Sequence, residues 1–98
     1  MKLAELSSQR LLLREPSSNT RQTFDAAMIK AGVSVGEILE IGSREAIKEA
    51  VAAGLGVGII AEMAVRDDPP GGDLVSRPVG HLFGQNVARV AFKRGAYL

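Results

Sequence analysis

The residues best suited to chemistry in this 98-residue chain are short polar side chains that follow apolar runs. Residues 17–20 and 42–44 each separate an apolar run from a helical pattern, and Ala61-Glu62 follows a third apolar run. At a helix N-terminus, unpaired backbone N–H groups and the helix dipole favour a bound anion. The pattern therefore predicts a site for a small, hydrogen-bonding, anionic ligand, although Ser, Thr and Asn before a helix are also typical of plain caps.

Charged side chains near these loops suggest two further contacts. Glu62 could pair with an ammonium group of a ligand, and Arg14, Arg21 and Arg44 could neutralise an anion, although each is more often an ordinary surface charge. The 12 basic and 11 acidic residues are scattered and give a formal net charge of +1. Because DNA-binding domains usually carry a basic stripe and a pI above about 9, we expect no direct contact between these residues and DNA.

Other kinds of active site find little support in the sequence. The chain has no cysteine, which excludes disulfides, zinc–thiolate sites and cysteine nucleophiles. The single histidine, His81, lies among loop-forming residues, so neither a metal site nor a catalytic triad is expected. The glycines of 54–58 precede a strand, whereas a dinucleotide fingerprint follows one. Glu15, Glu40 and Glu62 could meet at the strand ends, but solvated carboxylates are the common case, and we expect no enzyme activity and no cofactor.

The elements that must position the polar loops alternate between strands and helices. Strands are predicted over 10–14, 37–41, 56–60, 74–79 and 87–92, and helices over 19–31 and 44–53. Asn19 is the expected cap of the first helix, with Gln22 as its partner in a capping box, and Gly32 is expected to end it. Ser43 is the expected cap of the second helix. Residues 62–65 suggest one helical turn, and 67–72 a loop.

This order of elements predicts an α/β fold: a three-layer sandwich with a mostly parallel five-stranded sheet and helices on both faces. The strand over 87–92 alternates loosely and is expected at an edge or antiparallel. In such sheets ligands bind beyond the carboxyl ends of the strands, which is where the three polar loops lie. No apolar run approaches the roughly 20 residues that span a bilayer, and Lys2 and Glu5 do not suit a signal peptide. A single cytoplasmic domain without membrane contact is expected.

Two ordered blocks of the chain resemble the effector-binding region of LysR-type transcription regulators. Residues 12–21, LLREPSSNTR, resemble a segment that recurs in that family, and residues 40–60, EIGSREAIKEAVAAGLGVGII, resemble the next block. The later part, over 54–65 and 86–98, is similar to the branch that contains regulators of cysteine biosynthesis and of 2-aminoethylphosphonate use. The resemblance covers residues 11–97, nearly the whole chain.

The resemblance implies a lobe like those of type II periplasmic binding proteins, where two α/β lobes hold an effector between them. Residues 1–98 would form the second lobe, with the first lobe and the DNA-binding domain absent. The effector would be a phosphonate or another small anion, contacted by Ser17, Ser18, Asn19, Thr20, Gly42, Ser43, Ala61 and Glu62. Two departures bear on its identity: Gly42 stands where the sulfur-assimilation branch carries a Thr that helps to hold an anion, and Ser18-Asn19 replaces the usual Ser-Gly.

The leading hypothesis is therefore the ligand-sensing half of a LysR-type regulator, in which the effector shifts a conformational population. The alternative is a solute-binding lobe of the transport type, which in a periplasmic protein would carry an export signal. An enzyme would need a nucleophile or an acid–base pair that the sequence does not show. Association into a homodimer or a higher oligomer is also expected, because apolar surface left by an absent lobe promotes self-association.

Overall fold

The computed structural model describes residues 3–64, 72–81 and 87–95. Its elements are η1 (Leu3–Ser8), β1 (Leu11–Leu13), α1 (Asn19–Ala31), β2 (Ile38–Glu40), α2 (Arg44–Ala52), β3 (Val57–Ala61), η2 (Glu62–Ala64), β4 (Leu74–His81) and β5 (Val87–Lys93). All five predicted strands and both predicted helices are present, whereas the 3-10 helix η1 has no counterpart among the predicted elements. Val65 of the predicted helical turn and residues 67–71 of the predicted loop lie outside the described residues.

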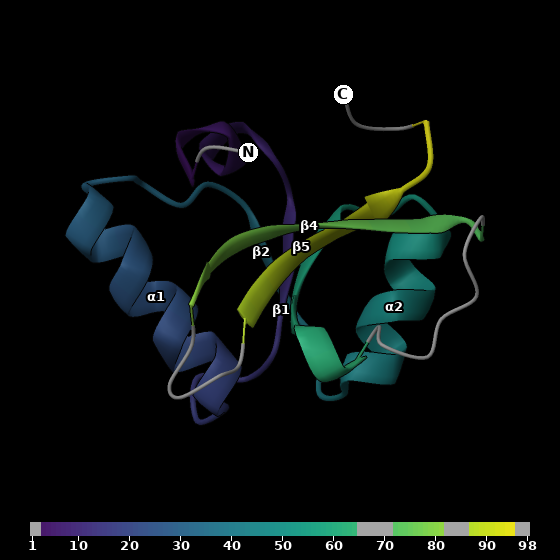
Figure 1. Cartoon of the computed structure of the whole chain (residues 1–98), viewed down its shortest axis with the longest axis horizontal. Coiled ribbons are helices and arrows are strands. Elements are labelled where there is room, and N and C mark those ends of the chain that lie inside the picture. The colour runs from purple at the N-terminus through teal and green to yellow at the C-terminus, as the bar shows by residue number, and fades with distance from the viewer. Residues whose placement is uncertain (1–2, 65–71, 82–86, 96–98) are drawn as a thin grey trace.

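The five strands form one open sheet in the order β2-β1-β3-β5-β4 (Figure 1). β1 pairs in parallel with both β2 and β3, whereas β5 runs antiparallel to both of its neighbours, β3 and β4. Because two of the four pairings are antiparallel, the sheet is mixed, and the prediction of a mostly parallel sheet is not confirmed. The strand over 87–92 was expected to lie at an edge or to run antiparallel. It runs antiparallel, as β5, but it lies inside the sheet between β3 and β4.

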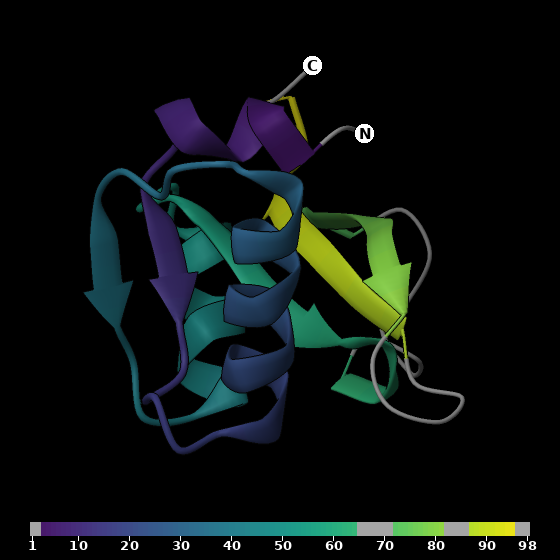
Figure 2. The same cartoon turned by 90° about the vertical axis from the view of Figure 1, so that its left-hand side faces the viewer.

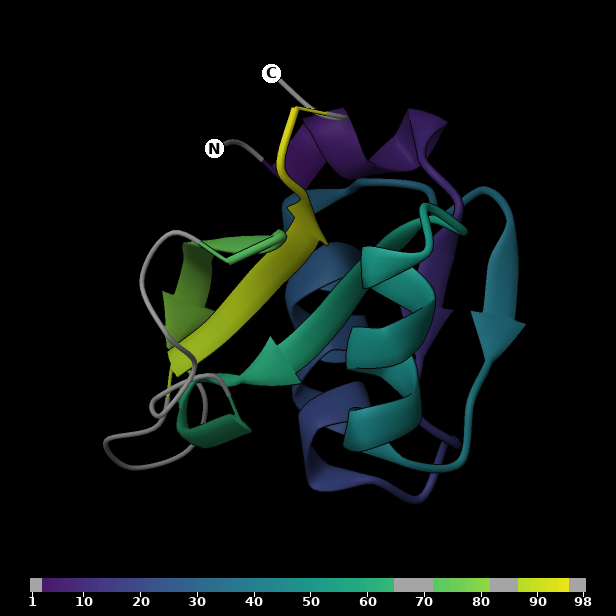
Figure 3. The same cartoon turned by 90° about the vertical axis from the view of Figure 1, so that its right-hand side faces the viewer.

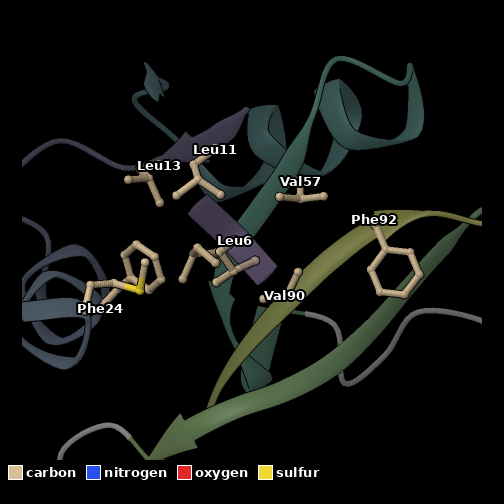
Figure 4. Packing of buried hydrophobic residues seen from close by; sticks show 9 residues of the cluster. Leu6, Leu11, Leu13, Phe24, Val57, Val90 and Phe92 are labelled. Carbon is tan, nitrogen blue, oxygen red and sulfur yellow. The ribbon is translucent and has the colours of Figure 1, made fainter. Parts of the chain in front are cut away.

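The two long helices pack on opposite faces of the sheet, so the fold has the three predicted layers (Figures 2 and 3). On the α1 face, side chains from η1, β1, α1, β3 and β5 converge (Figure 4). This α1-side cluster consists of Leu6, Leu11, Leu13, Phe24, Met28, Val57, Ile59, Val90 and Phe92. The α2-side cluster consists of Leu12, Ile47, Val51, Ile60 and Ala91. No described helix combines the length and apolar character that a membrane crossing requires.

Helix α1 begins and ends at residues whose chemistry explains both boundaries. Ser18, in extended conformation, is its N-cap, and the Ser18 Oγ accepts a hydrogen bond from the Arg21 amide. The prediction that Asn19 caps this helix is therefore wrong, since Asn19 is already its first helical residue. Gly32 ends the helix at a φ of 69°, a left-handed conformation that glycine adopts without steric cost, as predicted.

Helix α2 begins as the sequence predicts, with the Ser43 Oγ accepting a hydrogen bond from the Ala46 amide at 3.0 Å. Its buried side chains, Ile47 and Val51, lie directly over β3. A Cβ atom at Gly58 would come within 2.6 Å of the Ile47 Cγ2, so only glycine lets the helix approach this closely. This glycine therefore serves helix–sheet packing.

Candidate functional site

The structure brings the first two polar loops to one edge of the sheet. β1 and β2 are parallel neighbours in which Leu13 lies opposite Glu40, and the Ile41 amide donates to the Leu13 carbonyl at 2.8 Å. Directly beyond this pairing, the chain enters α1 on one face and α2 on the other. Figures 2 and 3 show the beginnings of both helices at the same sheet edge, opposite the edge where η1 lies.

The third polar loop follows β3, the other parallel neighbour of β1. Ala61 is the last residue of β3 and Glu62 is the first of η2, so this loop joins the same edge. We call residues 17–20, 42–45 and 61–62 the strand-end rim. Ser17, Asn19, Gly42, Ser43 and Glu62 are exposed there, and Ser18, Thr20 and Ala61 are half-buried. All eight predicted site residues therefore lie on one edge, within reach of solvent.

The rim carries backbone donors that the fold itself does not use. In α1 the Arg21 and Gln22 amides bind the cap residue Ser18, and in α2 the Ala46 and Ile47 amides bind the cap residue Ser43. The amides that precede them have no intramolecular partner among the described residues; these are the amides of Asn19, Thr20, Arg44 and Glu45. Two positively polarised helix ends therefore present free N–H groups at one edge, which is an arrangement that can hold an anion.

Two of the three predicted arginines are committed to internal contacts. The Arg14 guanidinium donates to Glu15, with Nη2 and Oε1 2.6 Å apart, and this hydrogen bond holds the pKa of Glu15 below its ordinary value. Arg21 pairs with Asp25 at 3.0 Å and donates to the Arg14 carbonyl at 2.8 Å. Arg44 is exposed and forms no ion pair within the described part of the chain. Of the three, Arg44 is the cation available to a ligand.

Glu62 has a partner that the sequence reading did not identify. Its Oε1 lies 3.6 Å from the Nη1 of Arg89 on β5, so it faces a cation of the chain itself rather than standing free for a ligand's ammonium group. Arg89 is a charged residue inside an apolar strand. That contrast with its neighbours in 87–92 is the signal that could have marked it from the sequence.

Two other features involve residues outside the predicted site. A hollow runs between α2 and the start of β4, lined by Glu45, Lys48, Glu49, Ala52, Gly72, Asp73 and Leu74. His81 is the last residue of β4 rather than part of a loop, and its side chain lies outside the described part of the structure. The described residues contain no group of three His, Asp or Glu side chains placed to hold a metal ion.

Comparison with known proteins gives related regulators in several bacteria. The chain is 41% identical over 96 residues to the HTH-type transcriptional regulator CysB of Burkholderia cenocepacia, covering 98% of this chain and 30% of that protein. It is 33% identical over 94 residues to the HTH-type transcriptional regulator CbbR of Rhodospirillum rubrum, covering 96% of this chain and 32% of that protein. The chain thus spans about a third of these relatives, which are transcriptional regulators and not enzymes.

A solved structure and a family model agree with these relatives. The structure of the Synechocystis PCC6803 CcmR regulatory domain in complex with 2-PG matches with a TM-score of 0.74 and 26% identity, over 100% of this chain and 47% of that one. The model of the LysR substrate binding domain matches residues 1–98. The chain belongs to the LysR substrate-binding domain family.

Proposed function

We propose that this chain is the ligand-sensing half of a LysR-type transcription regulator and binds a small anion at the strand-end rim. The observation that carries the proposal is the set of four unpaired amides at the beginnings of α1 and α2, together at one sheet edge. Such amides bind oxyanions without needing a charged side chain. The complex of the CcmR regulatory domain with 2-PG supports a small-molecule effector as the ligand class.

A second lobe would complete the site. The chain matches 47% of the CcmR regulatory domain, which supports a two-lobed arrangement of the type II periplasmic-binding-protein kind with the rim facing the cleft. An effector that bound one inter-lobe geometry better than another would shift the population toward it. DNA contact would belong to the helix-turn-helix part of the whole regulator, since the relatives are HTH-type proteins.

Amide chemical shifts offer a direct test, because they report weak binding to half a cleft. Titrating the labelled chain with inorganic phosphate, sulfate or 2-PG should shift the amide resonances of Asn19, Thr20, Arg44 and Glu45. The Ser43→Asp variant should stay folded, because Asp is as good an N-cap as Ser. It should bind the anion at least about tenfold more weakly, because it places a like charge at the site.

The control amides lie at the opposite edge, in and beside η1, and should not move. If all three anions leave the four rim amides unshifted in a folded chain, the proposed anion site is wrong. If they bind equally well to the Ser43→Asp variant, the anion sits elsewhere.

Self-association is a second part of the proposal. Large apolar side chains are exposed at several places along the chain: Ile29 at 80%, Met63 at 50%, Leu55 at 47%, Leu39 at 43% and Ile38 at 41%. Ile38 and Leu39 are adjacent on β2, an edge strand of the sheet, and an exposed apolar edge strand favours association with another copy. Multi-angle light scattering at rising protein concentration should show a dimer or a larger species. A mass that stays monomeric at millimolar concentration would contradict this expectation.

A further inference from the structure

Arg89 is held in one orientation by the neighbouring strand. Its Nε donates to the Ser76 Oγ at 2.9 Å, and its Nη2 donates to the Ser76 carbonyl at 3.3 Å. Side chains alternate between faces along a strand, so Arg89 shares the α2 face with Ala91 of the α2-side cluster. These two hydrogen bonds use one N–H of Nε and one of Nη2, so both N–H groups of Nη1 and the second N–H of Nη2 have no hydrogen-bond partner among the described residues.

The partner of that Nη1 group is close but is not hydrogen-bonded to it. The Glu62 Oε1 lies 3.6 Å away, beyond ordinary hydrogen-bond length. The Glu62 side chain is 48% exposed and the Arg89 side chain 22%. Ion pairs exposed to this degree contribute little free energy and open easily. The guanidinium is thus fixed in place, while its counter-ion is free to leave.

The pair lies beside the part of the rim where α2 begins. Glu62 follows the end of β3 directly, and Ala64, in the same turn of η2, accepts a hydrogen bond from the Lys48 Nζ of α2 at 2.8 Å. Figure 3 shows η2 and the beginning of α2 toward the same end of the sheet, with the end of β3 between them. The free amides of α2 and the Arg89 guanidinium are therefore presented on the same face of the sheet, near the same edge.

We propose that Arg89 is the cationic contact for the effector and that Glu62 is an internal anion which the effector displaces. This inference rests on the proposed function and deepens it. A guanidinium binds a tetrahedral oxyanion through two N–H groups, which fits phosphate, phosphonate or sulfate. The Glu62 carboxylate competes with the effector for Arg89, so an effector must bind Arg89 better than Glu62 does. Oxyanions of higher charge are therefore favoured over simple carboxylates.

A double-mutant cycle on the full chain tests the pair, with phosphate affinity measured by the same amide titration. Arg89→Gln should weaken binding about tenfold or more, because it removes a charged hydrogen-bond donor. Glu62→Gln should strengthen binding about threefold, because it removes the competing charge. In the Arg89→Gln background, Glu62→Gln should give no gain. The matched control is Arg77→Gln, since Arg77 is an exposed arginine on β4 that should leave affinity unchanged.

The outcomes separate the two proposals. If the unmodified chain binds no phosphate at all, the proposed function fails and this inference fails with it. If the unmodified chain binds and Arg89→Gln binds as well as Arg77→Gln, the anion site stands and Arg89 has no part in it. Should Arg89→Gln unfold, as circular dichroism would show, the Glu62→Gln variant still decides, because unchanged or weaker phosphate binding in that variant overturns the displacement step.

Discussion

Replacing Leu6 with Ala is expected to lower the free energy of unfolding by about 2–5 kcal/mol, as for other buried leucines. Leu6 is fully buried in the α1-side cluster, between side chains from β1, α1, β3 and β5 (Figure 4). Truncation would leave a cavity that these neighbours fill only in part. Because small domains are stable by only about 5–15 kcal/mol, the loss would be a large fraction of the total. Urea titration followed by circular dichroism measures it.

Leu55→Ala provides the matched comparison, because the same atoms are removed from a leucine that is 47% exposed. Its expected cost is close to the value for surface substitutions, about 0.5 kcal/mol. Equal losses for the two variants would show that η1 is not part of the folded core.

Gly58→Ala is expected to cost about 1–3 kcal/mol, the usual penalty for overpacking. The added Cβ would lie 2.6 Å from the Ile47 Cγ2 and 3.0 Å from the Val51 Cγ2. Both methyl groups belong to β-branched side chains on a helix, which have little rotamer freedom with which to move aside. Helix α2 would have to shift away from β3. The midpoint of thermal unfolding, measured by calorimetry, should fall accordingly.

Two further variants isolate this clash. Gly42→Ala should change stability little, because a Cβ at that position meets nothing within 4 Å. Combining Gly58→Ala with Ile47→Leu should recover part of the loss, because Leu has no Cγ2 branch at Cβ. If the double variant is no more stable than the sum of the two single effects predicts, steric contact with Ile47 is not the cause.

The two long helices were well predicted because capping residues and the spacing of apolar side chains determine where they begin and end. Gly32 and Ser43 act where the sequence places them, and the apolar spacing in α1 locates Phe24 and Met28 in the core. The Asn19 prediction failed by one residue because adjacent Ser and Asn are both good caps, and only the backbone conformation distinguishes them. Helix η1 was not predicted, because a 3-10 helix of six residues is too short to show a periodic pattern of apolar side chains.

The direction of the last strands was harder to predict, because side-chain alternation is the same in parallel and antiparallel strands. The connection length carried the missing information. Only residues 82–86 separate β4 from β5, which suits a hairpin, whereas a parallel crossover needs a dozen residues or more.

At the rim, the sequence could locate the loops but not the ion pairs. Whether Arg14 faces a ligand or Glu15, and whether Glu62 faces a ligand or Arg89, depends on contacts between side chains. Arg89 stands out among its apolar neighbours, but its partner Glu62 is far away in the chain, so local spacing does not indicate that the two form a pair.

The caps at Ser18 and Ser43 have a consequence for how such domains diversify. Both hydroxyls accept hydrogen bonds from their own helices, so under the proposed function the four unpaired donors at the helix starts are main-chain amides, which every residue type except proline supplies. Substitutions at Gly42, where a Cβ atom would meet nothing within 4 Å, could therefore change which anion is preferred while the amides of the strand-end rim stay in place. Under the proposed function, related domains could bind anions through the same main-chain amides and still respond to different metabolites.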